Sequence, residues 1–143
     1  ENVKYEKGEI KVVVYDEQGN KAGEKTVKTA GKPAKLQLTA DRSTIAADGS
    51  DLAFITVSLT DKNGTLCPDA DHSLEFKVTG AATFNSVCNG DATSLEVFTE
   101  PTMKLFHGQL VVVVQASEAP GKATLTVKDK NTGIRASLPI TVK

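Results

Sequence analysis

The sequence predicts an all-β protein in which an immunoglobulin-like β-sandwich is preceded by a β-hairpin. Apolar and polar residues alternate with a period of two along most of the chain, and no window carries the apolar stripe of a helix. The alternating segments are roughly five to nine residues long and are separated by turn residues about every ten positions, a spacing typical of β-sandwiches.

The first alternating segment, Glu9–Tyr15, is followed by turn residues at Asp16–Asn20 and by a return strand near Glu24–Lys28. Gly31, Lys32 and Pro33 then interrupt the pattern, and Pro33 cannot donate to a sheet ladder. We therefore predict that residues 1–31 are the terminal β-hairpin of an incomplete preceding sandwich domain. Residues 34–143 are predicted to form the immunoglobulin-like β-sandwich.

The clearest strand is Leu52–Thr60, in which alternate residues from Ala53 to Leu59 point inward. The Asn63-Gly64 pair that follows is the strongest short signal for a hairpin turn. The Gly80–Ser94 region loosens into short pieces. Further strands are predicted at Lys35–Ala40, around Leu74–Val78, at Leu110–Gln115, at Ala123–Asp129 and at Ile134–Val142, and the predicted core contains Val57, Leu59, Phe76, Leu125, Val127 and Leu138.

The first segment repeats near the end of the chain. Gly8–Asp16 and Gly121–Asp129 share one pattern, and each is followed by a glycine-containing turn and a second strand. Either the chain carries the last hairpins of two tandem modules, or two unrelated hairpins share a common pattern. We favour tandem modules, because the repeat spans a whole supersecondary unit.

The composition argues against several classes of partner. The 17 Lys and Arg residues nearly balance the 18 Asp and Glu residues, and neither basic nor acidic blocks occur, so nucleic acid and membrane surfaces are poor candidates. Trp is absent and Tyr occurs twice, so a cleft that stacks sugar rings is not favoured. The sequence starts at Glu1 without an initiator Met or a leader, and we expect it to be a segment of a longer protein.

No catalytic site, cofactor site or metal site is predicted. Glu75, Glu96 and Glu100 are carboxylates of the kind that glycoside hydrolysis uses in pairs, but a sandwich of this size offers no deep cleft, so we expect solvated charges. Asp41, Asp48 and Asp51 could bind calcium or form turns, and we favour turns. For Asn89-Gly90-Asp91 we likewise favour a tight turn over a binding loop.

The two cysteines leave two alternatives open. Cys67 and Cys88 do not have the spacing of a zinc site, since only His72 and His107 are available to complete the ligand set. They are either two separate, half-buried side chains, which we favour, or a disulfide between adjacent loops, which an exported protein would permit.

Several segments are specific enough to indicate a family. The run Leu38–Val57 resembles the C-terminal immunoglobulin-like domain of family 2 glycoside hydrolases, the β-galactosidase group. Asp61–Gly64 ahead of Pro68–Asp71 resembles the same domain. The same resemblance extends to Asn89–Ser94 ahead of Phe98, to Lys104, Phe106, Gly108 and Gln115, and to a preceding hairpin near Tyr5–Thr29 with the linker Thr29–Ala34.

The resemblance implies a non-catalytic accessory module, a spacer with at most weak glycan contact, in an exported enzyme. The parent would be periplasmic, secreted or on the cell surface, and its catalytic glutamates would lie in a barrel domain outside this chain. Neighbouring domains of the parent are the implied partners. The alternative is an immunoglobulin-like repeat of an invasin-type bacterial adhesin, which the Asp48-Gly49 and Asn63-Gly64 turns also resemble.

Residues 1–31 raise a separate question of partners. Ile10, Val12 and Val14 would face a core that the chain does not contain, and a lone two-stranded hairpin is marginal in water. The hairpin must fray, fold back on the sandwich or pair with a second copy. We expect ordering through contact with a neighbouring molecule, by self-association through residues 1–31.

Overall fold

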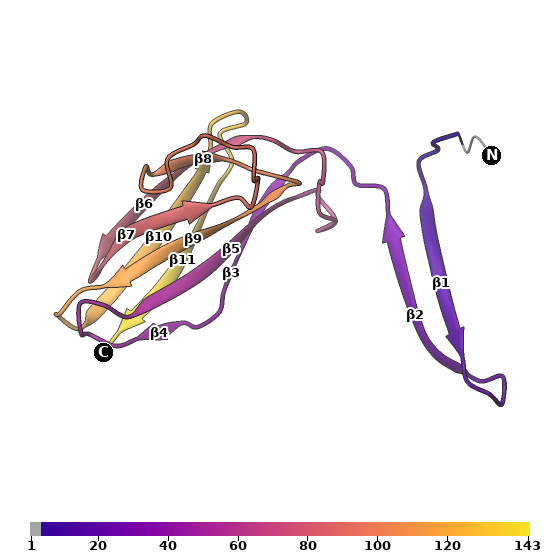
Figure 1. Cartoon of the computed structure of the whole chain (residues 1–143), viewed down its shortest axis with the longest axis horizontal. Helices are drawn as coiled ribbons and strands as arrows, with labels where there is room; N and C mark the ends of the chain where they lie inside the picture. Colours follow the sequence, from indigo (N-terminus) through magenta and orange to yellow (C-terminus); the bar gives the residue numbers. More distant parts are fainter. Residues whose placement is uncertain (1–3) are drawn as a thin grey trace.

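The computed structural model describes residues 4–143, which form eleven strands and no helix. Two packed sheets make a β-sandwich, and a separate two-stranded hairpin projects from one end of it (Figure 1). The predicted fold class is confirmed. Within the described residues, no helix is long and apolar enough to cross a membrane.

One layer is a four-stranded antiparallel sheet in the order β3-β5-β9-β7. The other is five-stranded, in the order β4-β11-β10-β6-β8, and only the β4–β11 pair is parallel. The first sheet comprises β3 (Lys35–Ala40), β5 (Leu52–Thr60), β7 (Ala82–Cys88) and β9 (Gln109–Ala116). The second comprises β4 (Thr44–Ile45), β6 (Ser73–Gly80), β8 (Thr102–Lys104), β10 (Gly121–Asp129) and β11 (Arg135–Val142).

The core lies between the two sheets and follows from the alternation in the sequence. In β5, Ala53, Ile55, Val57 and Leu59 are all fully buried, because successive side chains of a strand point to opposite faces. Five of the six predicted core residues are buried, and Leu138 is half-buried against the same cluster.

Strand β7 is the main element that the sequence pattern did not reveal. Its register shifts between Phe84 and Ser86, so that Ala82 and Phe84 pair across β9 on one side of the irregularity and Val87 on the other. An extra residue in a strand breaks the period-two alternation. The pattern around Gly80–Ser94 therefore looked like short pieces, although Ala82 and Val87 both reach the core.

The Asn63-Gly64 turn forms, but it does not lead into a β5–β6 hairpin. The Gly64 amide donates to the Asp61 carbonyl at 3.1 Å, and the turn closes a single bridge between Thr60 and Leu66. The chain then crosses to the other sheet, where β6 pairs with β10 and β8. A tight turn fixes only the local chain reversal. The sheet that β6 joins is decided by where its apolar face is buried, and β6 lies in the five-stranded sheet.

The N-terminal arm is an antiparallel hairpin of β1 (Glu9–Tyr15) and β2 (Lys21–Lys28), paired only with each other. One face carries ion pairs, such as Lys11–Glu24 at 2.7 Å. The other face is apolar and exposed: Ile10 and Val27 are cross-strand partners at 74% and 64% of full exposure, and Val12 and Val14 continue this face along β1 at 58% and 56%. The hairpin is neither frayed nor folded back on the sandwich (Figure 1).

Val57 should respond strongly to truncation. We expect Val57→Ala to lower the free energy of unfolding by about 1–3 kcal/mol, because it removes buried methyl groups and leaves a cavity between the sheets. Val97→Ala, at an exposed position of the β7–β8 loop, is the matched control and should change little. The urea midpoint at constant slope measures both, and equal midpoint shifts would show that the inward face is misassigned.

Candidate functional site

The linker between the hairpin and the sandwich is held by a carboxylate. Asp61, buried at the end of β5, accepts a hydrogen bond at Oδ2 from the backbone amide of Gly31 at 2.8 Å. A second bond, from the Ala34 amide to the Thr60 carbonyl at 2.8 Å, fixes the next part of the linker. We call these two contacts the linker clamp.

The other carboxylate oxygen of Asp61 organises the turn that follows it. Oδ1 accepts the amides of Asn63 at 2.8 Å and Thr65 at 2.9 Å. The Gly31 amide, followed by the Thr65 amide, holds the pKa of Asp61 below its usual value against the opposing effect of burial. The carboxylate is therefore ionised at neutral pH, and both the turn and the linker depend on its charged form.

Gly31 fits this contact because it has no side chain. A Cβ atom at this position would lie 3.3 Å from Asp61 Oδ2, which is tight for a carbon beside a bonded oxygen. Ala30, one residue earlier, packs half-buried against the core cluster. The linker is thus tied to the sandwich by a polar and an apolar contact in adjacent residues.

An open crevice of about 840 Å³ lies beside the linker clamp. Its walls are the base of the hairpin, from Lys7 to Glu9 and Lys28 to Thr29, and the sandwich turn from Asp61 to Asn63. The hairpin base is closed by the Thr29 amide, which donates to the Gly8 carbonyl at 2.9 Å. The crevice is therefore the space between two structural units that the clamp holds at a set distance.

Cys67 lies at the same end of the molecule. Its thiol is buried, 3.6 Å from the Gly31 carbonyl, whereas Cys88 is exposed, and the two are separate free thiols. Burial, aided by the negative charges of Asp61 and Asp69, raises the pKa of the Cys67 thiol. A thiol with a raised pKa is a poor nucleophile, and Cys67 serves as a packing residue. The expectation that both cysteines are half-buried was wrong, because β7 turns the Cys88 side chain outward.

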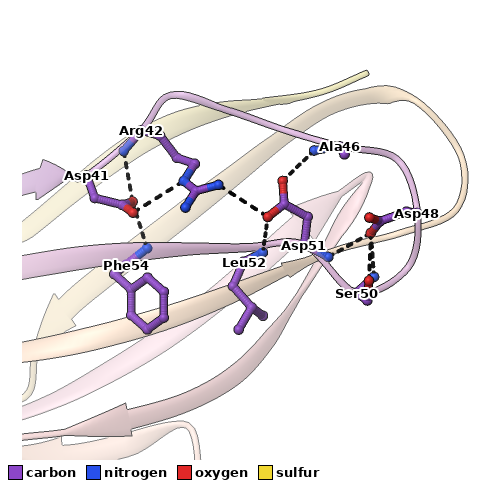
Figure 2. Close-up of polar contacts among 8 residues, drawn as sticks. All are labelled: Asp41, Arg42, Ala46, Asp48, Ser50, Asp51, Leu52 and Phe54. Carbon is purple, nitrogen blue, oxygen red and sulfur yellow. Dashed lines mark hydrogen bonds and ion pairs between the residues drawn. The ribbon is translucent and has the colours of Figure 1, made fainter.

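The acidic cluster at the opposite end of β5 forms turns (Figure 2). Asp41 accepts the amides of Arg42 and Phe54, and Asp51 accepts the amides of Ala46 and Leu52. Arg42 bridges the two carboxylates at 3.3 Å each. Asp48 likewise accepts the amides of Ser50 and Asp51. The carboxylates thus bond backbone amides of the adjoining turns, as the prediction of turn formation requires.

The three glutamates lie in different settings. Glu75 is exposed on β6, and Glu100 is exposed near the end of the β7–β8 loop. Glu96 instead accepts the Lys104 amide at 3.0 Å and so holds that loop against β8. Asn89 and Asp91 form a turn in the same loop, where Asp91 Oδ1 accepts the Thr93 amide at 2.8 Å.

One polar contact of a buried carboxylate was not foreseen from the sequence. His72 Nδ1 lies 2.8 Å from Oδ2 of Asp129, which is fully buried and also accepts the Thr132 hydroxyl. Burial alone would raise the pKa of Asp129, but the hydrogen bonds from Thr132 and His72 lower it. The pair ties the segment before β6 to the β10–β11 turn. No group of three His, Cys, Asp or Glu side chains gathers as a metal site within residues 4–143.

The described geometry is that of a β-sandwich with an N-terminal hairpin attached through a hydrogen-bonded linker, and its polar contacts hold turns and the linker. Residues 36–135 match the family described as glycoside hydrolase family 2 C-terminal domain 5. The chain belongs to this family.

Relatives of the chain support the same assignment. The β-galactosidase BoGH2A of Bacteroides ovatus is 44% identical over 136 residues, which is 95% of this chain and 16% of that protein. A crystal structure of a glycosyl hydrolase family 2 member from Bacteroides cellulosilyticus superposes with a TM-score of 0.93 at 36% identity, over 99% of this chain and 18% of that one. The chain therefore spans less than a fifth of the relatives that it matches, and it is a C-terminal domain of β-galactosidase-like family 2 proteins.

Likeness to adhesins is restricted to the fold. The D00-D0 domain of intimin covers 95% of this chain with a TM-score of 0.57, at 17% sequence identity. At that identity the match shows a shared β-sandwich architecture. The resemblance of the Asp48-Gly49 and Asn63-Gly64 turns to adhesin repeats reflects this shared architecture.

Replacing Asp61 should release the linker without unfolding the sandwich. In Asp61→Ala, we expect the Gly31 amide to exchange with solvent at least about tenfold faster, because its acceptor is lost. In the unaltered chain, the Gly31 amide should be fully protected from exchange above the ordinary carboxyl pKa of about 4. This protection should be lost as the pH falls through the lowered pKa that Asp61 has in the folded state. Hydrogen exchange followed by NMR measures both.

Asp48→Ala is the control for this experiment, since it removes a turn carboxylate at the other end of β5. Gly31 exchange should be unchanged in that variant. Equal acceleration of Gly31 in both variants would mean that global opening, and not the linker clamp, controls this amide.

Proposed function

We propose that the chain is a non-catalytic accessory module of a β-galactosidase-like family 2 glycoside hydrolase, and that it holds the sandwich in a set position against the preceding domain. The observation that carries the proposal is the linker clamp, the hydrogen bonds of Gly31 to Asp61 and of Ala34 to Thr60. It joins a complete sandwich to a hairpin whose apolar face lacks a core within residues 4–143.

The hairpin supports a role in a neighbouring domain. Ile10, Val12 and Val14 are each more than half exposed, so each forgoes a large part of the roughly 1.5–3 kcal/mol that full burial would contribute. The hairpin also repeats the arrangement of β10 and β11, the last hairpin of the sandwich. We infer that residues 1–31 complete a preceding sandwich domain of the parent, and that residues 34–143 form the accessory domain itself.

The comparison with a longer family 2 chain supports this proposal. The superposition on the family 2 member from Bacteroides cellulosilyticus includes nearly the whole of this chain, arm and sandwich together. A module that positions its neighbour requires a constant arrangement of hairpin and sandwich, and the high TM-score of this superposition supports such an arrangement. We further propose that the parent is exported, to the periplasm, the cell surface or the medium.

The isolated chain should not hydrolyse a chromogenic β-galactoside. The carboxylates Glu75 and Glu96 lie on a sheet face and in a loop contact, not as a facing pair in a cleft. The assay compares the chain with its Glu75→Gln and Glu96→Gln variants at high enzyme concentration. Turnover that either substitution abolishes would contradict the non-catalytic role.

Without its parent, the chain should associate through the exposed face of the hairpin. We expect a concentration-dependent mass above that of a monomer by analytical ultracentrifugation, and a monomer after deletion of residues 1–31. Val12→Lys, within the apolar face, should also give the monomer, whereas Lys11→Gln on the charged face should not. A full chain that is monomeric at all concentrations would remove the self-association proposal.

A further inference from the structure

The outer face of the five-stranded sheet carries an ordered set of charges. Core residues alternate with outward residues along β6, β10 and β11, so the register decides which outward side chains are neighbours. Arg135 of β11 lies opposite Lys128 of β10, and Lys128 lies opposite Glu75 of β6. One row further along, Thr126 lies between Ser137 and Lys77.

This arrangement places two cations directly across from each other. Like charges at opposed positions of an antiparallel pair destabilise the sheet, and Lys77 adds a third cation next to them. Glu75 is the one carboxylate of the set, which leaves two positive charges in excess. None of Glu75, Lys77, Lys128 and Arg135 forms an ion pair within 4.0 Å in the described part of the chain.

The same residues line a hollow in this face. A shallow groove of about 200 Å³ is bounded by Glu75, Lys77, Thr126, Lys128 and Arg135. The hydroxyls of Thr126 and Ser137, 3.1 Å apart, lie beside it and can exchange their mutual bond for bonds to a ligand. Lysine and arginine at this spacing suit an oxyanion, and arginine can bind a carboxylate or sulfate with two parallel hydrogen bonds.

We propose that this groove binds an acidic polysaccharide, with Lys77, Lys128 and Arg135 holding a carboxylate or sulfate group. Glu75, Thr126 and Ser137 provide hydrogen-bonding groups for the adjoining sugar hydroxyls. An oxyanion between Lys128 and Arg135 relieves the repulsion that the register imposes. The choice of a polysaccharide over other polyanions rests on the proposed glycosidase parent and on the absence of an aromatic side chain among the groove residues, where a nucleic-acid base would stack.

The test uses the 143-residue chain in affinity gel electrophoresis and in NMR titration at low salt. Polygalacturonate supplies the carboxylate arm, dextran sulfate the sulfate arm, a neutral galactan the uncharged arm and poly(dT) the nucleic-acid arm. We expect retardation by one or both acidic polysaccharides, not by the galactan, with amide shifts at residues 75–77, 126–128 and 135–137. Added salt should weaken binding, because ions screen exposed charges.

The double variant Lys128→Gln/Arg135→Gln should bind at least about tenfold more weakly. Lys4→Gln/Lys32→Gln is the matched control, since it removes the same net charge from exposed positions in the N-terminal segment and the linker, and its affinity should stay within about twofold. The groove variant should also melt at or above the temperature of the unaltered chain, because it removes opposed like charges. A purely structural role for these residues predicts a lower melting temperature.

Three outcomes would overturn the proposal: no retardation by either acidic polysaccharide, an equal loss of affinity in the control variant, or equally tight binding of poly(dT). The measurement requires no enzymatic activity. If the chain binds through the groove but its parent is not a glycosidase, the proposed binding site stands and only the proposed function fails.

Discussion

The arrangement of the whole chain depends on the carboxylate of Asp61. One oxygen closes the turn after β5, and the other accepts the amide of Gly31, thirty residues earlier in the sequence. A flexible linker would let the hairpin sample many orientations. Here, two linker amides are bonded at the same end of the sandwich, and a buried charged acceptor makes a stronger hydrogen bond than a neutral one.

This interaction belongs to a wider use of aspartate in the molecule. Asp16, Asp48, Asp61 and Asp129 each accept backbone amides of the residues that follow them. Such carboxylates replace the ladder bonds that are lost where a strand ends. Asp61 and Asp129 do more than their turns require, since each uses its remaining oxygen to hold a second segment: Gly31 in one case and His72 in the other.

The apolar face of the hairpin and the outer face of the five-stranded sheet differ in character. The hairpin face is apolar and is suited to burial against protein, which agrees with a position next to another β domain. The outer face of the five-stranded sheet is polar and cationic around Lys128, and it is suited to a solvated, charged ligand. A module with both features can be fixed to a neighbouring domain through one surface while the other remains accessible to a ligand.

The sequence by itself determined the fold class, most strands and the inward face of each, because a period of two records directly which side chains are buried. Glu9–Tyr15 and Lys35–Ala40 were predicted with the observed bounds for this reason. The local turns of Asp48 and Asp61 were also predictable, since an aspartate bonds the amides that follow it. Only the tertiary structure decided that β7 is a full strand, because its bulge breaks the alternation. Contacts between distant segments were likewise beyond reach: Asp61 with Gly31, His72 with Asp129, and Arg135 opposite Lys128 depend on strand order and register, which no local pattern encodes.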